Sequence, residues 1–172
     1  MLDAFKTLIA NQFEAAICTL NTCIDRCPET VWDARIANLR FCQVAFHTLF
    51  YADFYLGPSE VGFRDQPFHC DHPDFFRDYE EFEDRPPRCL YDRPAIKSYL
   101  EYCRRKASDT IAAETADSLA ARAAFPRRAF SRAELHLYNI RHIQHHAAQL
   151  SLRLRLDAGQ DVPWIGSGWR DV

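Results

Sequence analysis

The sequence predicts an all-α protein built as a four-helix bundle, and three observations lead to this fold class. Alanine, leucine, arginine and glutamate are frequent, whereas only five of the 172 residues are glycine; this composition favours helix over sheet. Apolar residues recur every three or four positions along four long stretches. Proline or glycine stands close to the end of each stretch, where helices commonly stop. The length fits one domain, so residues 1–172 are expected to form a single bundle.

The first two helices are expected over residues 2–27 and 33–56. A proline follows the first, and a Gly-Pro pair follows the second. The apolar stripe of the second helix carries two polar residues, Gln43 and His47. Because a bundle core does not bury unpaired amides or imidazoles cheaply, both residues are expected to have partners.

The third and fourth helices are expected over residues 93–124 and 131–157. The third is alanine-rich and only weakly patterned, and Pro126 lies just beyond it. The fourth opens with Ser131 and Glu134, whose spacing matches a capping box. A tail with two tryptophans follows, and it is expected to pack back on the bundle as an irregular arm.

The connection between the second and third helices, residues 58–92, is long and rich in proline, acids and aromatic residues. A connection of this length can cross the whole bundle, so the third helix can run parallel to the second. The other connections are short and imply antiparallel neighbours. The expected order is therefore up-down-down-up, with short helical turns inside the connection around residues 73–82.

Charge and composition exclude several classes of protein. The net charge is −3, with 21 basic and 24 acidic residues, so no large positive field is available to hold a nucleic-acid backbone. No apolar run approaches the roughly 18 residues of a membrane span, and no export signal precedes the first helix. Seven cysteines without export favour a reducing compartment. We expect a cytoplasmic protein that binds neither nucleic acid nor membrane.

Three histidines form the candidate metal site. His142 and His146 lie one helical turn apart, separated by about 40° around the axis and about 6 Å along it. His47 stands on the buried stripe of the second helix and can face them. Three neutral imidazoles are a common shell for Zn²⁺ and related ions such as Ni²⁺, and they leave positions open for water or substrate. We expect these three residues to hold one divalent metal ion.

The alternative is that the histidines are hydrogen-bonded core residues, which is the commoner role of a lone buried histidine. The polar positions Gln43, Asn139 and Gln149 on the same stripes favour the metal, because its outer partners would explain several of them at once. Other histidines are weaker candidates. His136 is expected at the surface or in a dimer contact, and the segment 69–72 in a solvent-exposed loop.

The segment from Leu137 to Leu150, LYNIRHIQHHAAQL, resembles the last-helix motif of the DinB-like superfamily. That motif reads Asn-x-x-His-x-x-x-His, followed by a small pair and Gln-Leu or Gln-Ile. His47 matches the first histidine of the family's metal triad. Helix order and loop lengths are similar over nearly the whole chain, although the motifs cover only the fourth helix and part of the second. Ala148 stands where the family often has glycine.

The resemblance implies a four-helix bundle with a long second connection, a three-histidine metal site and a homodimer. Some family members are similar to S-transferases that use the low-molecular-weight thiols bacillithiol or mycothiol, and to a thiol-dependent maleylpyruvate isomerase. The function expected from it is metal-dependent transfer of a thiol to a small electrophile. A metal-dependent hydrolase, a non-catalytic, stress-linked metal-binding bundle, and a bundle with purely structural histidines remain open.

In the expected mechanism, the metal favours the anion of a bound thiol or water. Tyr51 and Asn139 lie on the helix faces that would orient the attacking group, and Arg141 could contact an anionic group of the substrate. The alternatives are a core tyrosine at position 51 and a solvated or ion-paired arginine at position 141.

Overall fold

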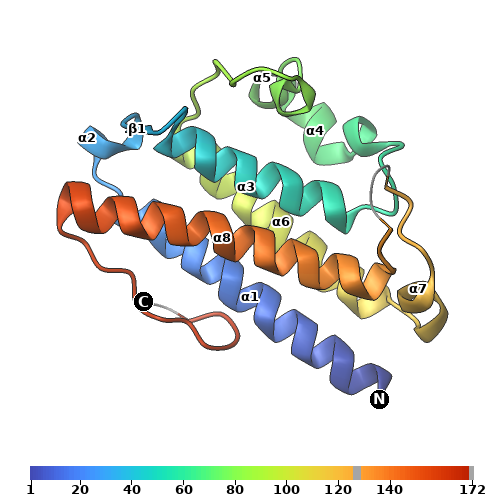
Figure 1. Cartoon of the computed structure of the whole chain (residues 1–172). Coiled ribbons are helices and arrows are strands. Elements are labelled where there is room, and N and C mark those ends of the chain that lie inside the picture. The colour runs from blue at the N-terminus through green and yellow to red at the C-terminus, as the bar shows by residue number, and fades with distance from the viewer. Residues whose placement is uncertain (126–128, 171–172) are drawn as a thin grey trace.

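The computed structural model describes residues 1–125 and 129–170, and this part of the protein is mostly helical (Figure 1). The four long helices are α1 (Leu2–Arg26), α3 (Phe41–Leu56), α6 (Arg93–Ala113) and α8 (Arg132–Ala158). Both α1 and α3 pack against α6 and against α8. Their apolar faces enclose one large cluster of buried side chains. The predicted all-α class is confirmed.

The second helix begins later than predicted, at Phe41 rather than near residue 33. The residues before it form α2 (Glu29–Trp32) and a short antiparallel hairpin of β1 (Arg35–Ile36) and β2 (Leu39–Arg40). Ala37 in the hairpin turn has a φ of 52°, a left-handed conformation that an α-helix cannot contain. The local turn therefore overrides the helical pattern.

The third helix ends earlier than predicted, at Ala113, and a separate short helix, α7 (Ala116–Ala120), follows. The hydroxyl of Thr115 accepts a hydrogen bond from the backbone N–H of Ser118 at 3.1 Å. This side-chain cap starts a new helix and separates it from α6. Pro126, expected beyond the third helix, lies outside the described residues.

The connection from α3 to α6 contains four short elements, which include the helical turns expected around residues 73–82. These are η1 (Phe63–Asp65), α4 (Pro67–Asp71), α5 (Pro73–Phe76) and η2 (Glu80–Phe82). In Figure 1, α4 and α5 lie along one side of α3. The Phe46 ring of α3 contacts Phe75 at a centroid distance of 5.2 Å and Phe76 at 6.2 Å. Aromatic packing thus covers α3 with the connection.

A buried carboxylate anchors the connection. Asp53 of α3 is fully buried, and its Oδ2 accepts hydrogen bonds from His69 Nε2 at 2.7 Å and from the Tyr99 hydroxyl at 2.8 Å. Lys106 of α6 pairs with its other oxygen. Burial alone would raise the pKa of Asp53, but the hydrogen bond from His69 and the charge of Lys106 outweigh it and lower the pKa. One anion therefore joins α3, α4 and α6.

This network corrects the expectation for the segment 69–72. His69 is 2% exposed, and its Nδ1 lies 3.1 Å from the Tyr79 hydroxyl. The other three residues of the segment are exposed, as expected. His69 is buried because Asp53 needs a donor in a place that water does not reach.

His136 is also buried, at 2% exposed, so the prediction of a surface position is wrong. Its Nε2 lies 2.9 Å from Glu114 Oε1, which also accepts from Arg132 Nε at 2.8 Å. The Arg132 guanidinium donates further to the carbonyls of Tyr55, Leu56 and Gly57. Because these carbonyls end α3, Arg132 fastens the start of α8 to the end of α3.

The tail after α8 packs back on the helices, as expected, and it does so along α1. Gly159 ends α8 with a φ of 64°, a conformation that glycine adopts without strain. The Gly168 N–H donates to the Asn11 carbonyl at 2.9 Å. The Arg104 guanidinium lies 3.9 Å from the centre of the Trp169 ring. Within the described part of the chain, no helix is both long and apolar enough to cross a membrane.

We expect Asp53→Asn to lower the free energy of unfolding by about 3 kcal/mol, because it leaves a half-buried lysine and a buried histidine without their anion. Urea denaturation monitored by circular dichroism measures this change. Asp25→Asn is the matched control: its carboxylate pairs with Lys97 but is 48% exposed, so a loss of about 0.5 kcal/mol or less is expected. Equal losses in the two variants would contradict the anchoring role.

Candidate metal centre

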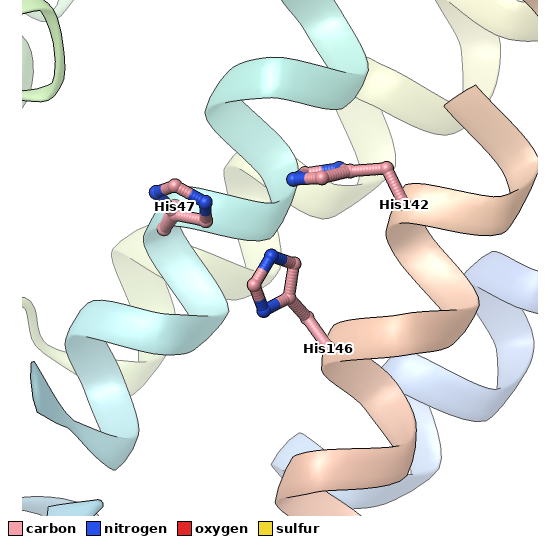
Figure 2. Close-up of side chains that lie close together, drawn as sticks. All are labelled: His47, His142 and His146. Carbon is pink, nitrogen blue, oxygen red and sulfur yellow. The ribbon is translucent and has the colours of Figure 1, made fainter. Parts of the chain in front are cut away.

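The packing of α3 against α8 brings three histidines together. His47 comes from the middle of α3, and His142 and His146 come from successive turns of α8 (Figure 2). One ring nitrogen from each lies within 4.8 Å of the other two. The ring centroids are 4.7 to 5.5 Å apart. The predicted meeting of these three side chains is confirmed, and together they form a group that could hold a metal ion.

Two of the three rings are oriented by neighbours. His47 Nδ1 lies 2.6 Å from Glu81 Oε2, and His146 Nδ1 lies 2.9 Å from Gln149 Oε1. When each Nδ1 carries the hydrogen that these acceptors require, the lone pair is on Nε2. Metal-binding histidines are commonly held in this way, with a carboxylate or carbonyl behind the ring.

Two buried polar atoms at the centre have no hydrogen-bond partner among the described residues. They are His142 Nδ1 and Glu81 Oε1. Such atoms are rare in folded proteins because burying them unpaired is costly. Their presence beside two oriented imidazoles fits a site that takes up a cation.

The electrostatic environment keeps the imidazoles of His142 and His146 neutral. Burial, with the repulsion of His146 and His47, lowers the pKa of His142 to about 3. Burial, with the repulsion of His47, lowers the pKa of His146 to about 4. Only the neutral form of a histidine binds a metal, so at pH 7 both rings are in the competent form.

The spacing of the group is slightly wider than a bound ion requires. With metal–nitrogen distances of about 2.0–2.1 Å, the nitrogens of a tetrahedral site lie about 3.3 Å apart. The ring nitrogens of the three histidines lie up to 4.8 Å apart. The side chains would therefore move inward to hold an ion. Three nitrogen ligands leave one position of a tetrahedral shell for a small molecule.

Glu81 is the functional candidate that the sequence interpretation missed. It lies in η2, within the connection between α3 and α6. Its backbone carbonyl also accepts a hydrogen bond from the Tyr51 hydroxyl at 2.7 Å. The only sequence signal for this role was the acidic character of the connection. Glu81 lies thirty-four positions after His47, and no spacing pattern predicts a contact between them.

Tyr51 lies beside the centre. Its ring centroid is 4.9 Å from that of His47 and 5.8 Å from that of His142. It also lines an open cleft of about 810 Å³ whose other aromatic residues are Phe54, Tyr55, Phe63, Phe82 and Phe125. Tyr51 thus stands between the three histidines and a cleft large enough for a small molecule.

The remaining polar candidates occupy other positions. Gln43 was expected to support the metal, but its amide donates to the carbonyls of Pro87 and Cys89 instead, each at 2.9 Å. Asn139 is buried and donates to the Ala52 carbonyl at 2.9 Å, which ties α8 to α3. Arg141 is exposed. The orienting roles of Tyr51 and Asn139, and the contact of Arg141 with an anionic group of the substrate, stay predictions.

Comparisons of the chain with models of protein families, with curated proteins and with solved structures found no match.

We expect Glu81→Gln to weaken metal binding about 10- to 100-fold, because the carboxylate that orients His47 is replaced by a neutral amide. Competition of Zn²⁺ or Ni²⁺ between the protein and a chromophoric chelator measures the affinity. Glu83→Gln is the matched control, since Glu83 lies two residues further on and pairs with Arg85. If Glu81→Gln binds the metal as tightly as the wild type, Glu81 does not support the site.

Proposed function

We propose that the protein is a metal-dependent enzyme of the DinB-like superfamily that transfers a low-molecular-weight thiol to a small electrophile. The observation that carries this proposal is the convergence of His47, His142 and His146. Three imidazoles, two of them held by outer partners, beside an open cleft suit a reactive centre better than a structural one, because structural zinc sites usually have four protein ligands.

The fold that we propose for this function is an up-down-down-up four-helix bundle. Two features support it: the contacts of α1 and α3 with both α6 and α8, and the long connection through residues 57–92. The short connection between α1 and α3 was expected to join neighbouring helices, but each of them packs mainly against α6 and α8. The connection of residues 27–40 therefore joins two helices that lie diagonally across the proposed bundle. A four-helix bundle with a long second connection is also what the resemblance of the α8 motif implies.

A bound divalent cation, Zn²⁺ or Ni²⁺ by the preference of imidazole ligands, would supply a positive charge that favours the anionic form of a thiol or water. His47, His142 and His146 would hold it. Glu81 and Gln149 keep two of the rings turned inward through the hydrogen bonds described above. The aromatic cleft beside Tyr51 would take the electrophile and exclude water from it.

We also propose a cytoplasmic location and a homodimer. The location is supported by the cysteines, which are all free thiols, six of them buried; free thiols persist in a reducing compartment. The dimer follows from the family resemblance. Size-exclusion chromatography with light scattering would test it.

The first test is the metal content of the purified protein. We expect about one equivalent of a divalent metal in the wild type and a stoichiometric loss in His142→Ala, measured by plasma mass spectrometry. His145→Ala is the matched control, because His145 neighbours the site on α8 but is exposed and lies outside the group. Full metal content in His142→Ala would contradict the proposal that the three histidines hold the metal.

The second test is activity. We expect the metal-loaded protein to couple a low-molecular-weight thiol to one member of an electrophile panel, and His47→Ala to lower the rate at least 100-fold because the metal is lost. His145→Ala should change it less than about threefold. Hydrolysis without thiol would favour the hydrolase, and metal binding without turnover would favour a non-catalytic bundle.

A further inference from the structure

A second cleft lies apart from the three histidines, between the β1–β2 hairpin and the segment 85–88. Its volume is about 520 Å³. The lining residues are Arg35, Asn38, Arg40, Gln43, Arg85, Pro86, Pro87 and Arg88. Four of the eight are arginine and none is acidic, although the whole chain carries a net charge of −3. Positive charge is thus concentrated at one concave place on an otherwise acidic protein.

The two walls of this arginine cleft are held by one buried side chain. Gln43 is 4% exposed, and its Oε1 accepts from the Arg40 N–H at 2.8 Å on the hairpin side. Its Nε2 donates to the carbonyls of Pro87 and Cys89 on the other side. The amide oxygen and the amide nitrogen of Gln43 thus each bond to one wall of the cleft. These bonds hold the two walls together, so the cleft is already formed without a ligand.

The acids near the cleft neutralise only one of its arginines. Arg85 forms ion pairs with Asp78, Glu80 and Glu83. The carboxylate of Glu80 is further engaged by the Cys89 thiol at 2.7 Å and by the backbone N–H of Arg88. Glu80 is therefore committed to the loop itself rather than to the other arginines of the cleft.

The other three guanidinium groups have no acidic partner in the described part of the chain. Arg40 donates to the backbone carbonyl of Asp33, which carries no net charge. The Asp33 carboxylate itself accepts from the Cys42 thiol at 3.3 Å. Arg35 and Arg88 are exposed, and neither side chain forms an ion pair with a described residue. Three like charges along one cleft repel each other unless an anion lies between them.

Guanidinium groups recognise planar or tetrahedral oxyanions through paired N–H donors, and they do so with higher specificity than a lysine. The cleft has the volume of a small-molecule site. Its first wall also includes the N-cap residue of α3, where the helix dipole adds positive potential. These features together select a compact ligand that carries more than one negative charge.

We propose that the arginine cleft binds a small molecule with two or more neighbouring oxyanion groups, either phosphates or carboxylates. Arg35 and Arg88, on opposite walls, pair with separate oxyanion groups, and Arg40 contributes between them. The binding does not require the metal. The cleft and the candidate metal centre nevertheless share two elements: Gln43 and His47 lie one turn apart on α3, and the segment 80–88 serves both sites through Glu81 and the arginines.

The experiment is calorimetric titration of the full-length protein with inorganic pyrophosphate and, separately, with citrate, at 150 mM salt. We expect saturable binding of one equivalent of at least one of these probes. The double variant Arg35→Gln/Arg88→Gln should weaken it about tenfold or more, because it removes two charged hydrogen-bond donors. Both side chains are exposed, so the variant is expected to fold, and circular dichroism checks this.

Two controls locate the binding. Arg105→Gln removes an exposed arginine of α6, outside the cleft, and should bind as the wild type does. His142→Ala should also retain full affinity, which separates the cleft from chelation of a metal at the histidines. If only pyrophosphate binds, the cleft is a site for phosphates. If only citrate binds, it is a site for carboxylates.

Three results would overturn the proposal. The first is the absence of saturable binding of either probe. The second is an equal loss in Arg105→Gln, which would indicate a general electrostatic effect. The third is loss of binding in His142→Ala with retention in the arginine double variant, which would assign the anion to the metal centre and leave the proposed function untouched.

Discussion

The buried carboxylate of Asp53 is the constraint on which the arrangement of the long connection depends. A charge with no access to water is costly unless its oxygens are paired and hydrogen-bonded. Here the donors come from α4, through His69, and from α6, through Tyr99 and Lys106. If the connection between α3 and α6 moved away from the helices, this buried carboxylate would lose its hydrogen bond from His69. The cost of that loss favours the position in which the connection lies.

That position has a consequence at the candidate metal centre. The connection that Asp53 holds also carries η2, and from η2 Glu81 reaches His47 and accepts the hydroxyl of Tyr51 through its backbone. The centre therefore combines residues from two long helices with a support from a segment of irregular structure. Rigid helices set the spacing of the three rings, and the connection sets the tautomer and direction of one of them. The aromatic packing of Phe46 against Phe75 and Phe76 adds to the same attachment.

The helical class and the meeting of the three histidines were predictable because both follow from periodicity: apolar residues at helical spacing, and two histidines four positions apart on one helix face. The start of α3 and the end of α6 were not, because a positive φ at Ala37 and a cap at Thr115 are local events that the apolar pattern does not carry. His69, His136 and Glu81 were missed for a different reason. Each is defined by a partner far away in the sequence, and long-range pairing leaves no spacing signal. The sequence carried one sign of such a pairing: Asp53 is the only acidic residue between Phe41 and Leu56, and a carboxylate in so apolar a helix needs a partner.

Metal coordination by three imidazoles is the central claim, and X-ray absorption spectroscopy of the metal-loaded protein at the metal edge tests it most directly. The account predicts a first shell of nitrogen and oxygen scatterers at about 2.0–2.1 Å, with the multiple-scattering pattern of three imidazole rings and no sulfur. Loading His146→Ala under the same conditions should remove one ring from that pattern or abolish binding. A shell that contains a sulfur scatterer at about 2.3 Å, or that lacks imidazole scattering, would contradict it.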